Sequence, residues 1–167
     1  MSTETQEAME MGTKPLKEHQ WLNKLVGEWR TETEMSMPDG SKESVRGTES
    51  VQNVGGLWSF GEGHGRMPGG EPLTYYTGLG YDVTFKEYRG FMMMSASSHL
   101  WKYTGHLSDD GRVMTLECEG PNMMGEGTAM YRDTIEITDG NHRTLTSTGQ
   151  DENGKWQQFM KVNYTRA

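Results

Sequence analysis

Short turn signals recur along the chain after Gly27, and their spacing constrains the fold more than any other feature. Asp-Gly pairs at 39–40, 110–111 and 139–140 are typical of tight hairpins. The intervals between turns are about 8 to 11 residues, which suits a strand and leaves no room for strand–helix–strand units. We therefore predict about ten strands, each antiparallel to its neighbours in sequence. The turn segments are residues 38–40, 54–56, 68–72, 81–87, 96–99, 108–111, 120–125, 138–141 and 151–154.

The first predicted strand, residues 27–37, alternates between two kinds of side chain. One set of alternate positions is charged, and the other carries a tryptophan, two threonines and two methionines. This alternation indicates a strand with one solvated and one buried face. Ten strands in up-and-down order form a sandwich or a closed barrel, and closure removes the exposed edges. We predict an all-β, antiparallel, closed β-barrel of about ten strands, wide enough for a cavity.

One short helix is expected over residues 16–26, before the first strand. Its apolar residues fall on a single stripe, and Gly27 suits the residue that ends a helix. A helix this short needs a packing partner, so we expect it to plug one end of the barrel. The stripe consists of Trp21, Leu22, Leu25 and Val26.

Composition and charge limit the classes of function. The net charge of -8 argues against nucleic acid and an anionic membrane surface as partners. No apolar run approaches the roughly 20 residues of a membrane helix. Residues 1–14 contain neither a basic region nor an apolar stretch, so we expect a disordered tail, no secretory signal and a cytoplasmic protein. Residues 15–167 are expected to form a single domain.

The sequence contains no recognisable metal or catalytic motif. Cys118 is the only cysteine, and the glutamates on either side of it would raise its thiol pKa. The histidines show no metal-ligand spacing, and no Ser-His-Asp set is readable. In the run Met92-Met93-Met94, alternate residues face opposite ways, so the run cannot converge on a copper ion. We expect no metal, no cofactor and no catalytic residue set.

The two ends of the domain carry a device that could close the barrel. Gly27 and Trp29 open the first strand, and Arg166 ends the last, so an up-and-down barrel brings them together. We predict that the Arg166 guanidinium lies on the face of the Trp29 indole. This arrangement resembles the calycin signature of lipocalins and fatty-acid-binding proteins, in which a G-x-W and a late arginine lock the barrel base. The resemblance implies a structural role for all three residues.

Several motifs extend the resemblance to the whole domain. They are H-Q-W-L-N-K-L-V-G-E-W at 19–29, Y-T-G-L-G-Y-D at 76–82, L-E-C-E-G at 116–120 and N-Y-T-R at 163–166. Together they resemble a family of small bacterial proteins classed as a domain of unknown function and associated with lipocalin-like or nitrobindin-like β-barrels. The family brings no established activity.

Two ligand-binding devices of related barrels do not carry over. Nitrobindin-like barrels hold heme through a histidine near the C-terminal end, and here residues 159–166 contain no histidine. Fatty-acid-binding proteins use a late R-x-Y to hold a carboxylate, whereas here Tyr164 precedes Arg166. The resemblance therefore implies neither heme nor a fatty-acid clamp.

The third strand, L-W-S-F-G-E-G-H-G-R at 57–66, carries the best polar pair in the chain. Trp58, Phe60, Glu62 and His64 share one face, and small residues occupy most of the other. If the aromatic face points inward, Glu62 and His64 reach the cavity mouth, where they could share a proton or hold a ligand. The alternative is that the pair is solvated or that the opposite face is the inner one.

For the second strand, too, either face could point into the barrel. Glu49 shares a face with Val45 and Val51, and an inward carboxylate needs a partner because burying a lone charge is costly. Arg132 or His64 could supply it. In the alternative, Arg46 and Thr48 face inward instead.

These observations favour a barrel that binds a small apolar or amphipathic ligand in a cavity of about 300 Å³ or more. Methionines adapt their shape, and tyrosine hydroxyls orient ligands. One alternative is an enzyme that uses Glu62 and His64 as acid and base. Another is a structural or interaction protein, a homodimer with a filled barrel. The predicted ligand-binding residues are Trp58, Phe60, Glu62, His64, Tyr76, Met92, Met94, Tyr103 and Met160.

Overall fold

The computed structural model of the protein describes residues 14–167. The predicted disordered tail at residues 1–14 lies outside this part of the chain, except for Lys14. Within residues 14–167, two short helical segments precede ten strands. The strands are β1 (Gly27–Ser36), β2 (Lys42–Val54), β3 (Trp58–Arg66), β4 (Pro72–Asp82), β5 (Glu87–Met94), β6 (Ser97–Leu107), β7 (Val113–Pro121), β8 (Thr128–Asp139), β9 (His142–Gln150) and β10 (Trp156–Arg166).

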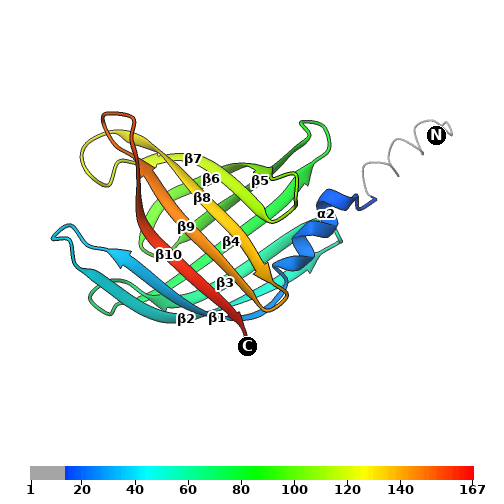
Figure 1. The fold of residues 1–167 in the computed structure, drawn as a ribbon, viewed down its shortest axis with the longest axis horizontal. Coiled ribbons are helices and arrows are strands. Elements are labelled where there is room, and N and C mark those ends of the chain that lie inside the picture. The colour runs from blue at the N-terminus through cyan, green and yellow to red at the C-terminus, as the bar shows by residue number, and fades with distance from the viewer. Residues whose placement is uncertain (1–13) are drawn as a thin grey trace.

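The ten strands form one closed antiparallel barrel, as predicted (Figure 1). Each strand pairs with its neighbour in sequence, and β1 pairs with β10 to complete the ring. In that closing pair Trp29 lies opposite Arg166, and Met35 lies opposite Met160. The alternating residues of β1 therefore place Trp29, Thr31, Thr33 and Met35 on the inner face, in agreement with the sequence analysis.

Aspartates fix several of the turns that connect the strands. Asp39 accepts hydrogen bonds from the hydroxyl and the backbone N–H of Ser41, and these bonds lower the pKa of Asp39. The hydroxyl of Ser108 and the backbone N–H of Arg112 do the same for Asp110. These bonds satisfy backbone donors that the strand ladders leave free.

The helix covers one end of the barrel, as predicted, but its α-helical part is shorter than expected. Helix α2 spans Lys17–Trp21, and a 3₁₀ turn, Leu22–Lys24, follows it (Figure 1). The His19 Nδ1 atom accepts a hydrogen bond from the backbone N–H of Leu16, so His19 caps the helix N-terminus from within. Neither segment, within the described residues, is long and apolar enough to span a bilayer.

The predicted closure device is present. The Arg166 guanidinium lies 4.2 Å from the centre of the Trp29 ring. Its Nη1 donates to the Val26 carbonyl at 2.7 Å, and its Nε donates to the Gly140 carbonyl at 2.7 Å. Gly27 has a φ of 129°, and a Cβ atom there would collide with the Arg166 side chain. These contacts tie the helical segment, β1, β10 and the β8–β9 turn together.

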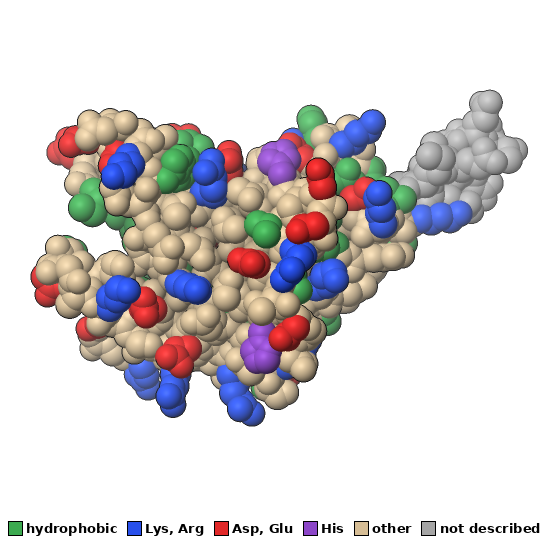
Figure 2. All heavy atoms as spheres, in the orientation of Figure 1, with side chains coloured by type: hydrophobic (Ala, Val, Ile, Leu, Met, Phe, Trp, Pro, Cys, Tyr) green, Lys and Arg blue, Asp and Glu red, His purple; other side chains and the backbone are tan. Residues whose placement is uncertain are grey.

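The two ends of the barrel differ in how they are covered. At the base, α2 and the 3₁₀ turn place Trp21, Leu22 and Leu25 in the core. At the mouth, the opposite end, five hairpin turns surround an opening, and Figure 2 shows the molecule hollowed there. The mouth turns join β1–β2, β3–β4, β5–β6, β7–β8 and β9–β10.

Candidate functional site

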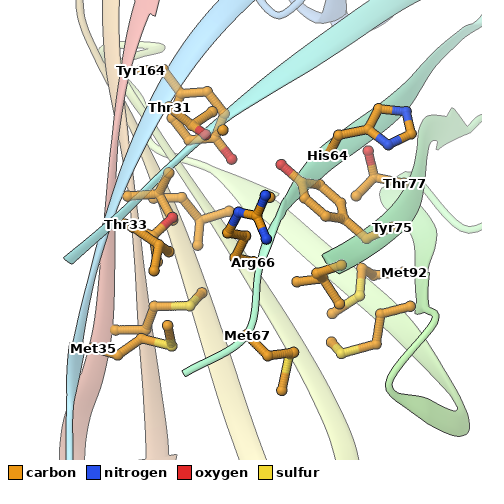
Figure 3. Close-up of a pocket in the computed structure, with 18 of the residues that line it drawn as sticks. Thr31, Thr33, Met35, His64, Arg66, Met67, Tyr75, Thr77, Met92 and Tyr164 are labelled. Carbon is orange, nitrogen blue, oxygen red and sulfur yellow. The ribbon is translucent and has the colours of Figure 1, made fainter. Parts of the chain in front are cut away.

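A cavity of about 160 Å³ occupies the barrel lumen below the mouth (Figure 3). The inner faces of most strands contribute to its wall, which is mainly aliphatic and thioether with several hydroxyls. The aliphatic and thioether residues are Met35, Val45, Met67, Leu73, Met92, Met94, Leu145, Met160 and Val162. The hydroxyl-bearing residues are Thr31, Thr33, Tyr75, Thr77, Tyr103 and Tyr164.

The cavity is smaller than the roughly 300 Å³ expected for a typical ligand pocket. Large inward side chains fill part of the lumen, because a barrel of ten strands is only slightly wider than one that its own side chains can fill. Below the cavity a void of about 60 Å³ lies beside Arg143, and both spaces border Tyr103 and Tyr164. The lumen is therefore filled at the base and hollow towards the mouth.

The prediction that Trp58, Phe60 and Glu62 face the lumen is wrong. Trp58 is 47% exposed and Phe60 39% exposed, and both lie on the outer wall. The inner face of β3 consists of Ser59 and three glycines. At Gly63 the ring of Tyr75 from β4 occupies the place that a side chain would take. The glycines thus make room for large side chains from neighbouring strands.

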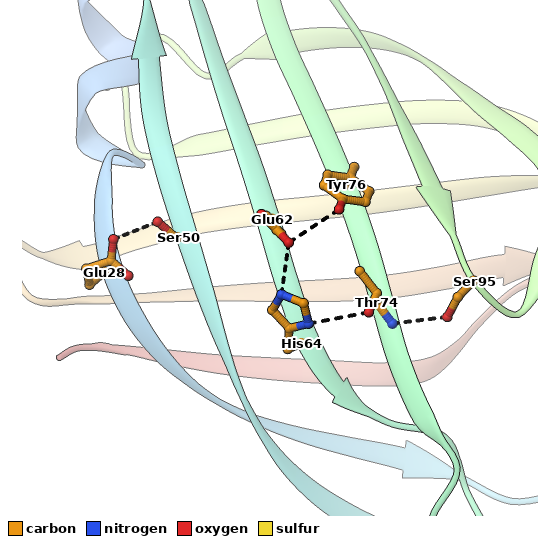
Figure 4. A network of polar contacts seen from close by, with 7 residues as sticks. All are labelled: Glu28, Ser50, Glu62, His64, Thr74, Tyr76 and Ser95. Atoms are coloured by element: carbon orange, nitrogen blue, oxygen red, sulfur yellow. Dashed lines mark hydrogen bonds and ion pairs between the residues drawn. The ribbon is translucent and has the colours of Figure 1, made fainter.

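Glu62 and His64 do form a pair, on the outer wall of β3 (Figure 4). The His64 Nε2 atom lies 3.0 Å from a Glu62 carboxylate oxygen, and both side chains are about half exposed. The Tyr76 hydroxyl donates to the same carboxylate at 3.3 Å, and Thr74 lies 3.3 Å from the other ring nitrogen of His64. Solvent screens such a pair, so it contributes little to stability. Neither Glu62 nor Tyr76 lines the cavity.

Four of the nine predicted ligand-binding residues line the cavity on its inner wall, namely Met92, Met94, Tyr103 and Met160. His64 also borders the cavity, although its half-exposed side chain lies on the outer wall of β3. Met92 and Met94 both reach the cavity across a β-bulge in β5, whereas Met93 is exposed on the outer wall. Thr31 and Thr33 also line the cavity. The sequence analysis placed both on the buried face of this strand but did not include them among the ligand-binding residues.

The base of the lumen holds a buried ion pair. Glu49 faces inward, and its partner is Arg143 of β9, at 3.4 Å, rather than the predicted Arg132 or His64. Arg132 instead pairs with Glu117, outside the lumen, at 3.0 Å. Burial raises the pKa of Glu49, and the adjacent Arg143 guanidinium opposes this rise.

The same guanidinium stacks on two aromatic rings. Arg143 lies 3.7 Å from the ring centre of Tyr164 and 4.7 Å from that of Trp29. Trp29 therefore contacts two arginines, Arg143 and Arg166. The Arg143 Nε atom is buried and has no hydrogen-bond partner among the described residues, and Arg143 borders the small void at the base. A void of this size holds a water molecule, which could accept that bond.

A second carboxylate, Asp133 of β8, faces the cavity, and no cation of the described residues pairs with it. The Tyr103 hydroxyl donates to one of its oxygens at 2.5 Å, and the Ser147 hydroxyl donates to the other at 2.6 Å. Burial raises the pKa of Asp133, and these two hydrogen bonds oppose the rise. None of the ion pairs among residues 14–167 includes Asp133.

Among residues 14–167, we find neither a reactive thiol nor a metal-binding cluster. Cys118 is buried in β7, and burial together with the Asp133 carboxylate raises its thiol pKa to about 12. A thiol with this pKa is a poor nucleophile at neutral pH. In the described part of the chain, no three His, Cys, Asp or Glu side chains lie close enough to share a metal ion.

Comparisons with known proteins identify the fold and the family. An S-type phycobiliprotein lyase, CpeS from Guillardia theta, superposes with a TM-score of 0.60 at 14% identity, over 93% of this chain and 94% of the lyase. Rv2717c from M. tuberculosis superposes with a TM-score of 0.64 at 14% identity, over 92% of this chain and 99% of that one.

At this identity the two likenesses establish the barrel fold alone. No curated protein matches the chain. The family model described as "Protein of unknown function (DUF1579)" matches residues 14–166, which include every strand of the barrel. The chain therefore belongs to the DUF1579 family.

Proposed function

We propose that the protein binds a small apolar or amphipathic molecule in the mouth half of the lumen. The observation that carries this proposal is the 160 Å³ cavity, which is open at the mouth and walled mainly by methionine and aliphatic side chains. A lumen that served only to stabilise the fold would gain from being filled, because each void forfeits packing contacts.

The cavity sets the size of the ligand. An apolar cavity of about 150 Å³ accommodates one benzene molecule, so the space here suits a single ring or a short branched chain. Met35, Met92, Met94 and Met160 lie around it, and flexible thioether side chains can reshape a pocket for somewhat larger molecules. The lyase in the comparison is named for chemistry on phycobiliproteins, and its 14% identity does not carry that chemistry to this chain.

Titration with toluene tests the proposal. With methyl-¹³C-labelled methionine, we expect the NMR signals of the lumen methionines Met92 and Met160 to shift together, with saturation. The signals of Met93, on the outer wall, and of Met124, on the β7–β8 turn, serve as internal controls and should stay in place. Toluene shifts confined to the outer methionines would refute the proposal. Native mass spectrometry of the protein as purified is a separate measurement, and it would report the mass of any natural ligand that the protein retains.

A second candidate function is self-association. Exposed apolar side chains gather on the outer wall formed by neighbouring strands β3 to β6, and a patch of this kind often marks an interface. The patch consists of Trp58, Phe60, Met93 and Leu100. Sedimentation equilibrium of the wild type and of Trp58→Lys tests it: a dimer that the substitution converts to a monomer supports this function, and a monomeric wild type rejects it.

A further inference from the structure

We propose that Asp133 is the polar anchor of the lumen and that the site selects a small primary amine, bound as its cation, with an apolar ring or chain. This inference rests on the proposed function, since it names the ligand class of the same cavity. The apolar part would occupy the space among the methionines, and the ammonium group would reach the Asp133 carboxylate.

The geometry around Asp133 leaves part of the carboxylate free to accept further bonds. An ionised carboxylate offers about four acceptor positions. Tyr103 and Ser147 occupy one position on each oxygen, at 2.5 Å and 2.6 Å. Asp133 also lines the cavity, so its remaining acceptor positions are accessible to a molecule held there. A primary ammonium group has three donors and suits such an acceptor.

The charge balance of the lumen favours a cation. The other inward carboxylate, Glu49, has its own cation in Arg143, whereas no ion pair of the described residues includes Asp133. The fold has already removed Asp133 from bulk water and fixed it with two hydroxyls. An incoming ammonium must therefore lose only its own hydration, and its attraction to the carboxylate is strengthened by the low local dielectric.

The opposite assignment, an anionic ligand, rests on the arginines at the mouth. Arg46 and Arg66 border the cavity, but both are exposed. Arg66 already donates to the Gly70 carbonyl at 2.7 Å. Water solvates a guanidinium in this position, so its attraction for an anion is weak. An anion that entered the lumen would also approach the Asp133 carboxylate.

Isothermal titration of the full chain with three probes of one shape tests the inference. Benzylamine, toluene and benzoate share the aromatic ring and differ in the charge of the substituent. We expect benzylamine to bind on the order of 10- to 100-fold more tightly than toluene, as a hydrogen bond to a charged group allows, and benzoate to bind most weakly.

Two variants assign the preference to Asp133. Asp133→Asn keeps the size of the side chain and removes its charge, so benzylamine should lose its advantage while toluene affinity changes by less than about threefold. Glu152→Gln makes the same change of net charge on the exposed β9–β10 turn at the mouth, and it should leave both affinities unchanged. Circular dichroism shows whether each variant is folded.

The outcomes separate the two proposals. If toluene binds in the lumen but benzylamine binds no more tightly, or benzoate binds best, the role of Asp133 is wrong and the apolar site stands. An Asp133→Asn variant that keeps the amine preference also overturns that role. If none of the three probes binds, the proposed function fails and the inference fails with it. If Asp133→Asn does not fold, the order of the wild-type affinities for benzylamine, toluene and benzoate still tests whether the site prefers an amine.

Discussion

The base and the mouth of one lumen use their inward side chains in opposite ways. At the base, Arg143 contacts both Trp29 and Glu49, and the void beside it is only about 60 Å³. At the mouth, methionines and threonines surround about 160 Å³ of space. The same closed sheet supports both ends, so the difference lies in the side chains that each strand places at each level.

This difference separates the residues that stabilise the barrel from those that form the space for a ligand. The base contains the closure device, the buried ion pair and the residues of the helix that reach the core. The mouth has flexible side chains and a carboxylate held by hydroxyls. Substitutions at the base should therefore change mainly stability, and substitutions at the mouth should change mainly binding.

The largest effect is expected from Trp29→Ala. This change removes a 2% exposed indole and its contacts with Arg143 and Arg166. We expect the free energy of unfolding to fall by about 3 to 5 kcal/mol, as for other buried aromatic residues. Urea unfolding followed by far-UV circular dichroism measures it. A loss below about 1 kcal/mol would show that the closure device does not hold the base together.

The next effect is expected from Glu49→Gln. The substitution leaves the Arg143 charge buried without its carboxylate partner, which should cost about 3 kcal/mol of unfolding free energy. Glu62→Gln is the matched control, because it breaks a pair whose side chains are about half exposed and should cost less than about 0.5 kcal/mol. Equal losses for the two variants would contradict the assignment of the inner faces.

A pair of methionines compares the two ends directly. Met114, in the base half, is completely buried, and Met160 borders the cavity. We expect Met114→Ala to lower the unfolding free energy by about 3 kcal/mol and Met160→Ala by about 1 kcal/mol. Met160→Ala should also enlarge the cavity and retain toluene binding. If the two losses are reversed, the mouth is the packed end of the lumen.

The sequence predicts the frame of the barrel well because local signals determine it. Turn segments separated the ten strands, and Gly27, Trp29 and Arg166 identified how the ends meet. The face of β3 was assigned wrongly because alternation distinguishes two faces without showing which one is inside. The Trp58 ring lies over Gly80 of β4 on the outer wall. To predict this contact, one must know which residue of β4 pairs with Trp58.

The pairing of Glu49 with Arg143 could not be predicted from the sequence either. Arg143 is 94 residues away in the chain and reaches Glu49 across the lumen, from a strand that is not its neighbour in the sheet. The sequence also did not predict that Asp133 faces inward, because this depends on the register of β8 with β7 and β9. Contacts across the lumen thus need the closed sheet as well as the strand pattern.

The smallest effect is expected in the pH dependence of stability. The pKa shift of the lumen carboxylate Asp133 has the opposite sign to that of the turn carboxylate Asp39. The folded-state pKa of Asp133 is raised, so the unfolded chain loses that proton first and stability falls as pH rises above about 4. The folded-state pKa of Asp39 is lowered, so its contribution is lost as pH falls. Urea unfolding at pH 4 and pH 7 should show the wild type losing stability relative to Asp133→Asn as pH rises. No relative change would place Asp133 in water, and the opposite trend would mean that its folded-state pKa is lowered.

The division of the lumen into a filled base and a hollow mouth is tested most directly by a crystal structure under xenon pressure. We predict xenon in the cavity, in contact with Met92, Leu145 and Met160, and none in the void beside Arg143, because the buried Arg143 Nε atom favours a water molecule there. A lumen without xenon, with bound atoms only on the outer wall around Trp58 and Phe60, would contradict the account.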